Sequence, residues 1–273
     1  MRPWIMFTKH LKGWDLEQII DGLKRATVEG ADLCVRPGYP VNPENAPKEL
    51  PAAAKRFADE GLCIPMITTP GDFTHAEIPY AQPLFEACAE AGVKLIKLGY
   101  WYMEEGGYWA TIDRCRQRLE GFAKLAEKTG VKAMVHNHSG STMGLNSASV
   151  MNIVKGFDPA HVGVFADPGH LSIVGEPYPM AFDIVREYLS ACAFKDLIRQ
   201  KYIENGKPVW RIDMMPLGLG FGNFPQVMQI LKDMNFTGPI SFHCEYERLS
   251  PESIIDQCRL DVRYIQEIVD KLA

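Results

Sequence analysis

The 273-residue sequence predicts an α/β protein with a single closed (β/α)8 barrel, and three observations lead to this prediction. First, Gly30, Gly61, Gly92 and Gly130 each separate an amphipathic stretch from an apolar run, a pattern typical of a helix end that leads into a buried strand. Second, these glycines are 31, 31 and 38 residues apart, enough for one strand, one helix and two loops. Third, the same spacing extends over the chain to eight strands, which is the strand number of a closed parallel barrel.

The predicted strands are short apolar segments, each followed by an amphipathic stretch. They cover residues 4–8, 31–36, 62–68, 93–99, 131–138, 162–167, 191–196 and 239–245. The stretches between them carry apolar residues at i, i+3, i+4 and i+7, as in residues 16–23, which indicates helices lying on a sheet. The last helix is expected over residues 251–272, after a Ser-Pro start signal. An open doubly wound sheet is the alternative arrangement.

We expect residues 1–273 to form one domain, because no segment resembles an interdomain linker. The longest stretch without a periodic pattern, about residues 197–222, interrupts the seventh strand–helix unit. It is expected to be an irregular loop inserted at the active site. Its glycine-rich end at residues 218–222 suggests a phosphate-binding loop as an alternative, although it matches neither a P-loop nor a dinucleotide-binding motif.

Composition and charge exclude several classes of protein. The chain is 47% hydrophobic and 23% charged, as in folded globular domains. Its 29 Lys and Arg against 34 Asp and Glu give a net charge of -5, which argues against a nucleic-acid partner. No stretch reaches the ~18 apolar residues of a membrane span, and the seven cysteines form no C-x-x-C pair. We therefore expect a cytoplasmic protein without membrane or nucleic-acid partners, and leave a homo-oligomer open.

Polar side chains gather where the predicted strands end, which is where (β/α)8 enzymes place their chemistry. Five of the seven histidines lie there: His10, His136, His138, His170 and His243. Alternate residues of a strand share a face, so His136 lies beside His138 and His243 beside Glu245. A face with imidazole and carboxylate groups is costly to bury unpaired. It therefore predicts either a wet pocket or a divalent metal site.

The same strand ends carry a family resemblance. The motifs are H-N-H at 136–138, D-P-G-H at 167–170, K-D at 195–196, P-L-G-x-G at 216–220 and G-P-I-S-F-H-C-E-Y-E at 238–247. Together with K-H-L at 9–11 and V-R-P-G at 35–38, they resemble the xylose-isomerase-like TIM barrel superfamily, in particular its sugar phosphate isomerase/epimerase branch. The resemblance covers nearly the whole chain and implies a TIM barrel that acts on sugars.

Members of this superfamily hold a divalent metal with Glu, Asp, His and Glu on the fifth to eighth strands. By position, the resemblance implies metal ligands His136, Asp167 and Glu245 for Mn, Co, Zn or Mg. His136 replaces the first Glu, and Ala193 replaces the family histidine, so one ligand is lost. Leu219 also replaces a loop carboxylate found in many relatives. Glu247, two residues after Glu245 on the same strand face, is the alternative residue for the role of Glu245.

The candidate residues have functional and structural interpretations. The catalytic candidates are Glu245, His138 and His170 as acids or bases, and Lys195 as a group that steadies an oxyanion. Lys9, Arg36 and Lys97 are substrate-binding candidates, because their cationic groups can bind sugar oxygens. Trp101 is a fourth candidate, because it lies in a cluster of aromatic residues suited to sugar stacking or a dimer contact. The structural alternatives are a helix cap at Asp167, an ion pair between Lys195 and Asp167 or Asp196, and histidines that only orient loops.

The sequence thus predicts a metal-dependent sugar isomerase or epimerase whose partner is a small sugar or sugar derivative. A base would remove the proton next to a carbonyl, and the enediolate would be reprotonated on another face or carbon. A lyase that eliminates from a keto sugar or a 3-keto glycoside is the alternative, since it uses the same intermediate. A second alternative is a non-catalytic accessory barrel that has lost its metal. A family-2 apurinic/apyrimidinic endonuclease is disfavoured, because it needs more metal ligands and a positive groove.

Overall fold

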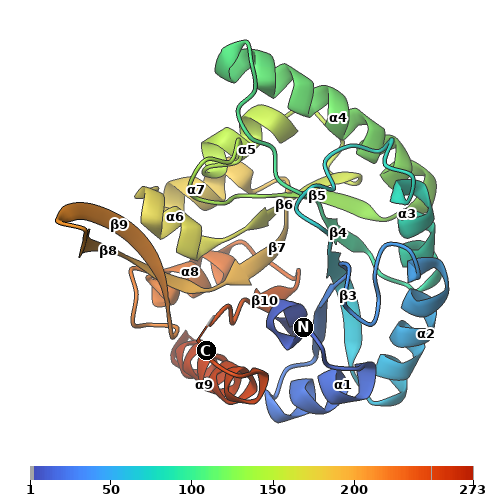
Figure 1. Ribbon diagram of the computed structural model, residues 1–273, viewed down its shortest axis with the longest axis horizontal. Helices are drawn as coiled ribbons and strands as arrows, with labels where there is room; N and C mark the ends of the chain where they lie inside the picture. The colour runs from blue at the N-terminus through green and yellow to red at the C-terminus, as the bar shows by residue number, and fades with distance from the viewer. Residues whose placement is uncertain (1–2, 247, 273) are drawn as a thin grey trace.

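The structure, a computed structural model that describes residues 3–246 and 248–272, contains the predicted closed barrel (Figure 1). Its parallel strands are β1 (Trp4–Phe7), β2 (Gly30–Cys34), β3 (Cys63–Thr68), β4 (Leu95–Lys97), β5 (Lys132–His136), β6 (Val162–Ala166), β7 (Leu189–Phe194) and β10 (Ile240–Phe242). Around the barrel their order is β1-β10-β7-β6-β5-β4-β3-β2. All eight predicted strands are confirmed. The pairing of β1 with β10 closes the sheet, so the open doubly wound alternative is wrong.

Helices surround the barrel on its outside (Figure 1). They are α1 (Leu16–Arg25), α2 (Ala46–Asp59), α3 (Ala81–Glu90), α4 (Gly107–Thr129), α5 (Ser147–Val154), α6 (Pro168–Val174), α7 (Tyr178–Val185), α8 (Phe224–Asp233) and α9 (Pro251–Leu272), with a short 3-10 helix η1 (Thr8–Leu11). In α1, Ile19, Ile20 and Leu23 are buried on the barrel side, as the apolar spacing predicts. None of the described helices is long and apolar enough to cross a membrane.

The core has an outer and an inner layer. The outer layer lies between helices and strands and contains large rings such as Phe57, Phe122 and Phe224. The inner layer fills the barrel itself with Ile5, Met66, Met134, Phe165, Ala191 and Ala193. Ala193 thus faces the barrel axis, where relatives are expected to carry a metal-binding histidine, and offers only a methyl group. Because apolar side chains fill the middle of the barrel, polar groups at the strand ends form a layer above them.

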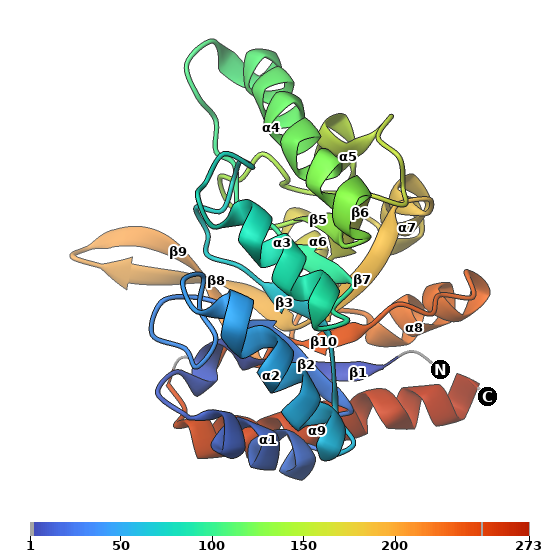
Figure 2. The same ribbon diagram turned by 90° about the vertical axis from the view of Figure 1, so that its right-hand side faces the viewer.

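Residues 197–215 form a hairpin instead of the expected irregular loop, whereas residues 216–222 have no helix or strand. β8 (Asp196–Glu204) pairs antiparallel with β9 (Lys207–Met215) in a hairpin. Asn205 and Gly206 connect the strands with φ values of 51° and 73°, and two positive φ values are what the favoured two-residue hairpin turn requires. The hairpin projects beyond the carboxyl ends of the barrel strands (Figure 2).

The glycine-rich segment 218–222 binds a carboxylate of the protein itself. The N–H groups of Gly218 and Gly220 donate to Asp196 Oδ2 at 2.9 and 2.8 Å, and the N–H of Gly222 donates to Oδ1 at 2.8 Å. A Cβ on Gly220 would come within 2.3 Å of Asp196 Oδ1, so a larger residue does not fit there. These three N–H groups are occupied by Asp196, and the segment is therefore not the phosphate-binding loop considered as an alternative.

Replacing Asp196 by asparagine is expected to lower the free energy of unfolding by about 2–4 kcal/mol, because hydrogen bonds to a buried charged acceptor contribute about 1.5–3 kcal/mol each. Asp196 is fully buried, and asparagine keeps only one acceptor oxygen for the three glycine N–H groups. Urea denaturation measures the change. Asp233→Asn, at an exposed carboxylate on α8, is the control and should leave the midpoint nearly unchanged. Equal midpoints for both variants would contradict this role of Asp196.

Candidate active site

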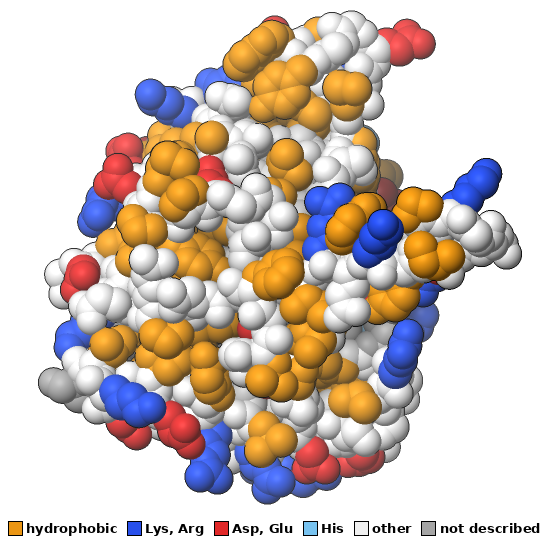
Figure 3. All heavy atoms as spheres, turned by 90° about the vertical axis from the view of Figure 1, so that its left-hand side faces the viewer, with side chains coloured by type: hydrophobic (Ala, Val, Ile, Leu, Met, Phe, Trp, Pro, Cys, Tyr) orange, Lys and Arg blue, Asp and Glu red, His pale blue; other side chains and the backbone are white. Residues whose placement is uncertain are grey.

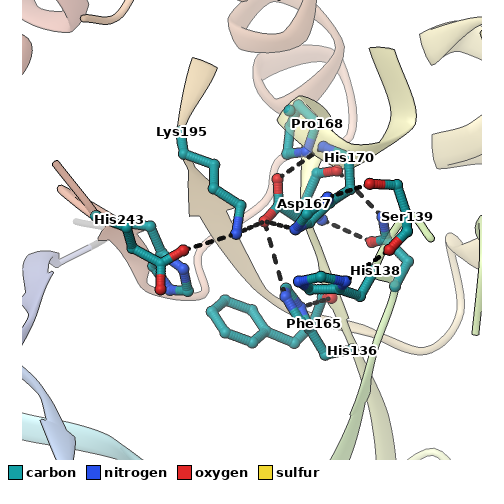
Figure 4. A network of polar contacts seen from close by, with 12 residues as sticks. His136, His138, Ser139, Phe165, Asp167, Pro168, His170, Lys195 and His243 are labelled. Atoms are coloured by element: carbon teal, nitrogen blue, oxygen red, sulfur yellow. Dashed lines mark hydrogen bonds and ion pairs between the residues drawn. The ribbon is translucent and has the colours of Figure 1, made fainter. Parts of the chain in front are cut away.

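Asp167 lies at the centre of a polar cluster at the carboxyl ends of β5, β6 and β7. It is the N-cap residue of α6, and its Oδ1 accepts the N–H of His170 at 3.1 Å. Its Oδ2 lies 3.7 Å from His136 Nε2, 3.8 Å from His170 Nε2 and 3.3 Å from Lys195 Nζ (Figure 4). The helix-cap and functional interpretations of Asp167 are therefore compatible, since one oxygen caps the helix and the other faces the cluster.

His136, Asp167 and His170 form a group that fits a divalent cation. One ligand atom from each lies within 4.8 Å of the others. Asp167 Oδ2 and His170 Nε2 are buried without a hydrogen-bond partner. His136 Nδ1 lies 3.0 Å from the Phe165 carbonyl oxygen, which can only accept a hydrogen bond, so Nε2 is left with a free lone pair. Two imidazoles and a carboxylate are donors suited to Mn, Co or Zn.

The charge states of this group also suit a metal. Burial, followed by the nearby lysine charges, holds the pKa of His136 and His170 well below the ordinary value, so both rings are neutral. Neutral imidazole is the form that binds a metal. Burial raises the pKa of Asp167, and the charge of Lys195 counteracts part of that effect. Lys195 thus already supplies one cation beside this carboxylate, and a metal between His136 and His170 would favour its ionised form further.

Glu245 lies beside this group, but it is not one of the three potential ligands. Its Oε1 accepts from Lys9 Nζ at 2.8 Å and its Oε2 from Lys195 Nζ at 3.1 Å. Lys195 therefore bridges Glu245 and Asp167. Its contact with Asp167 is the ion pair that the sequence offered as the structural alternative for this lysine. Burial alone would raise the pKa of the Glu245 carboxyl, but the lysine charges hold it well below its usual range. The group of possible ligand atoms that converges in the structure thus includes His170, where the family resemblance implied Glu245.

Glu247, the stand-in for Glu245, lies outside the described residues. Lys195 itself is buried, which disfavours its charge. The carboxylates of Asp167 and Glu245 outweigh this effect and raise the pKa of Lys195, so its ammonium group stays charged between them.

His138 lies on the open side of the cluster. Its ring lies against that of His170, tilted by 43° with the centroids 3.8 Å apart, and its Nδ1 lies 2.8 Å from the Ser139 carbonyl oxygen. It lines a cleft of about 780 Å3 together with Lys9, His170, Lys195 and Glu245. The structure thus brings all four predicted catalytic residues and one predicted substrate-binding residue to a single cleft.

The metal-free protein is expected to lose stability as the pH falls from 7 to 5. Burial and the charge of Lys195 lower the pKa of His138 from 6.5 to about 4. On acidification the unfolded chain therefore binds a proton before the folded protein does, and the stability present above pH 6.5 is lost toward pH 4. This amounts to about 2 kcal/mol for His138 between pH 7 and 5, and His136 and His170 act in the same direction. Urea denaturation with a chelator present measures the slope.

The matched variant for this pH effect is His138→Gln, which has no titrating group at that position. It should lose part of the pH slope while keeping a midpoint at pH 7 close to that of the unmodified protein. The same slope in both proteins would show that His138 does not titrate as described.

The other three substrate-binding candidates do not line this cleft among the described residues. Arg36 Nε donates to the Thr69 carbonyl oxygen at 3.0 Å, which holds the side chain beside the β3 end. Trp101 is buried, and its indole N–H donates to the Thr74 carbonyl oxygen at 2.9 Å. The expectation that Trp101 forms an exposed sugar-stacking wall or dimer patch is therefore wrong. In that aromatic cluster, Tyr102 and Trp109 are the exposed rings.

Lys97 ends β4 and is almost completely buried below the cleft. Its Nζ has no hydrogen-bond partner and lies 3.6 Å from the centroid of the Tyr100 ring. Burial, followed by the charge of Arg36, lowers the pKa of Lys97 well below its ordinary value. Among the described residues, Lys97 thus has no salt bridge that offsets the cost of burying an amine.

Replacing Lys97 by methionine is expected to raise the free energy of unfolding by about 1–3 kcal/mol, since an apolar chain of similar length removes the cost of a buried polar group without a partner. Thermal and urea unfolding measure the gain. Lys94→Met, at the exposed start of β4, is the control and should change stability little. A less stable Lys97→Met protein would show that the contact with Tyr100 outweighs the cost of burial.

A second polar network lies deeper in the barrel and was not predicted. Asp32 Oδ1 accepts from Thr68 Oγ1 at 2.7 Å, and its Oδ2 accepts from Ser241 Oγ at 3.0 Å and lies 3.4 Å from His243 Nε2. His243 thus contacts Asp32, and its charge also helps to lower the pKa of Glu245, beside which strand alternation had placed it. The sequence did contain a signal for this network. Asp32 lies in the middle of an apolar strand, and a buried carboxylate requires hydrogen-bond partners.

The fold resembles several solved structures. The 3-keto-D-glucoside 4-epimerase from E. coli is 13% identical, with a TM-score of 0.75 over 98% of this chain and 100% of that chain. The IOLI protein with a bound zinc atom is 15% identical, with a TM-score of 0.76 over 98% of each chain. The probable 3-DHS dehydratase AsbF from Bacillus anthracis is 15% identical, with a TM-score of 0.71 over 96% of this chain and 99% of that chain. At these identities the likeness shows a common fold.

A search of curated proteins gave no match. The sequence does match a family model, described as xylose isomerase-like TIM barrel, over residues 13–266. This match covers far more than half of the chain, and the closed barrel and the polar strand ends agree with it. The chain therefore belongs to the xylose isomerase-like TIM barrel family.

Proposed function

We propose that this protein is a metal-dependent enzyme that isomerises or epimerises a sugar by removing a proton from a carbon next to a carbonyl. The observation that carries the proposal is the convergence of His136, Asp167 and His170 beside a cleft, with Asp167 Oδ2 and His170 Nε2 buried without a hydrogen-bond partner. Structurally similar proteins include a 3-keto-D-glucoside 4-epimerase and an L-ribulose 3-epimerase, which supports a sugar as the substrate.

His136, Asp167 and His170 would hold the divalent metal, with Mn, Co, Zn and Mg as candidates. When bound there, it would supply Lewis acidity that makes a C–H bond beside a carbonyl easier to break. Lys195 lines the same cleft as a buried, charged donor, so it is placed to stabilise negative charge on a sugar oxygen.

Glu245 and His138 are the proton-transfer groups in this proposal. Glu245 is ionised and accepts the carbon-bound proton, while the electron pair of the broken C–H bond moves toward the carbonyl oxygen. A sugar oxygen that takes a hydrogen bond from Lys195 relieves Glu245 of one lysine contact and makes it a stronger base. His138 is neutral and its Nδ1–H donates to the Ser139 carbonyl oxygen, so its Nε2 is unprotonated. In this proposal Nε2 first takes a proton from a sugar hydroxyl or from solvent and then returns it to another face or carbon.

Elimination is the second candidate reaction. Proton removal by Glu245 also permits loss of a leaving group from the next carbon, and a structurally similar protein is a probable dehydratase. The accessory-barrel alternative, suggested by Ala193 and Leu219, is less well supported. A barrel without a metal would leave His170 Nε2 buried without a hydrogen-bond partner and Asp167 Oδ2 with only the Lys195 ion pair, which is costly.

The test is proton exchange at carbon in D2O, followed by NMR. Purified protein is first analysed for bound metal and then incubated with keto sugars, their phosphates and 3-keto glycosides, with Mn, Co, Zn or Mg added. We expect metal-dependent loss of one carbon-bound proton signal, and a new signal from a leaving group if elimination follows. Protein that binds none of these metals and exchanges no proton in any of these substrates would overturn the proposal.

A further inference from the structure

The catalytic groups occupy only one end of the cleft. From Lys195 and Glu245 the cleft continues to the hairpin, where Ile198, Gln200 and Tyr202 line it. These are alternate residues of β8, so one face of the hairpin forms a continuous wall. A volume of about 780 Å3 lies in the range of pockets for drug-sized ligands, and a single sugar ring at the metal group would leave the hairpin end empty.

The outer part of the cleft combines an aromatic ring, apolar side chains and hydrogen-bonding groups. Tyr202 is held by its hydroxyl, which donates to Asp213 Oδ2 at 2.7 Å, and its side chain stays 36% exposed. Met214 and Leu249 supply apolar surface nearby, and Gln200 supplies an amide. An aromatic ring with polar groups at its edge suits a ligand ring that has a flat apolar face and hydroxyl groups.

The opposite face of the hairpin lines the cleft only at its base, through Ile212 and Met214, and leaves the cleft toward the turn. Register pairs Lys201 with Trp210, and neither residue lines the cleft among the described residues. Trp210 is 57% exposed and lies beside Arg199. Figure 3 shows hydrophobic and basic side chains together on the projecting hairpin. The two faces of one hairpin therefore provide a test residue, Tyr202, and a matched control, Trp210.

We propose that the substrate is a glycoside, whose attached ring binds the hairpin wall made by Ile198, Gln200 and Tyr202 while its sugar ring lies at the metal group. This inference rests on the proposed function, because it places the reacting sugar at His136, Asp167 and His170. The attached ring is an aryl group or a second sugar, since both present a flat apolar face to an aromatic side chain. A phosphate in its place is disfavoured, because the glycine N–H groups of residues 218–222 are bound to Asp196.

The kinetic test compares kcat/KM for an aryl 3-keto glucoside, a 3-keto disaccharide and free 3-ketoglucose. We expect at least one glycoside to exceed the free keto sugar by about tenfold or more, and Tyr202→Ser to lower that ratio about tenfold. Tyr202→Phe, which keeps the ring, and Trp210→Ser, on the opposite face, should keep the ratio. The glycoside that gives the larger ratio identifies the attached ring.

A binding test separates this proposal from the proposed function. Calorimetric titration with phenyl glucoside, which needs no turnover, should show affinity that falls about tenfold in Tyr202→Ser and stays in Trp210→Ser. Proton exchange with equal kcat/KM for free and substituted sugars, unchanged by Tyr202→Ser, would overturn the glycoside proposal and leave the proposed function standing. Phenyl glucoside binding that depends on Tyr202, without proton exchange in any substrate, would support the wall and overturn the proposed function.

Discussion

Asp167→Asn is expected to abolish metal binding and to lower the rate of proton exchange by at least about 10^3-fold. Asp167 is the only negatively charged member of the group with His136 and His170, so its amide leaves two neutral rings that hold a divalent cation poorly. The Lewis acidity of a metal contributes several kcal/mol to such a reaction, which corresponds to a loss of this size. Elemental analysis of the purified variant and NMR exchange in D2O measure both effects.

Asparagine is chosen because it separates a lost metal from a lost fold. It keeps the side-chain oxygen that accepts the N–H of His170, so the cap of α6 is preserved. Asp183→Asn, at an exposed carboxylate on α7, is the matched control and should bind metal and exchange protons as the unmodified protein does. An Asp167→Asn protein with near-stoichiometric metal would remove Asp167 from the ligand group.

The barrel could be predicted because its signal is local and repeated. Several strands, such as β3, β4 and β5, are short apolar runs after a helix that ends near glycine, and burial on both sides requires such runs. The hairpin was missed because most of its side chains are exposed on both faces, so apolar alternation is weak. The hairpin was indicated instead by the Asn205-Gly206 pair, which favours a tight turn whether or not the strands on either side are hydrophobic.

The sequence predicted which residues lie in the candidate site better than it predicted what each of them does there. Strand alternation correctly placed His136 and His138 near each other, but it does not extend past the end of β6. There Asp167 caps a helix, and capping brings His170, three residues later, to the same side. The contacts of Glu245 with Lys9 and Lys195 depend on how β1, β7 and β10 meet around the closed barrel, which no short segment specifies.

Glu245→Gln is expected to lower kcat by about 10^2–10^4-fold while the metal stays bound. A positioned general base contributes a factor of this size, and glutamine cannot accept the proton. The metal should remain because the ligand atoms that converge in the structure belong to His136, Asp167 and His170. Elemental analysis and initial rates of proton exchange, measured on the same preparation, give the two quantities together.

The two readouts distinguish the roles that sequence and structure give to Glu245. The family resemblance makes it a metal ligand, whereas the structure pairs both of its oxygens with lysine ammonium groups. If Glu245 is a metal ligand, the Glu245→Gln protein should lose bound metal and proton exchange in parallel, and excess metal should restore part of the exchange rate. If Glu245 is the base, the Glu245→Gln protein should keep its metal and lose only proton exchange, and no metal concentration should restore the exchange rate. Glu187→Gln, at an exposed glutamate, should change neither quantity. Because lysine contacts offset the charge of Glu245 in the free protein, loss of metal in Glu245→Gln would show that those contacts give way to the metal when it binds.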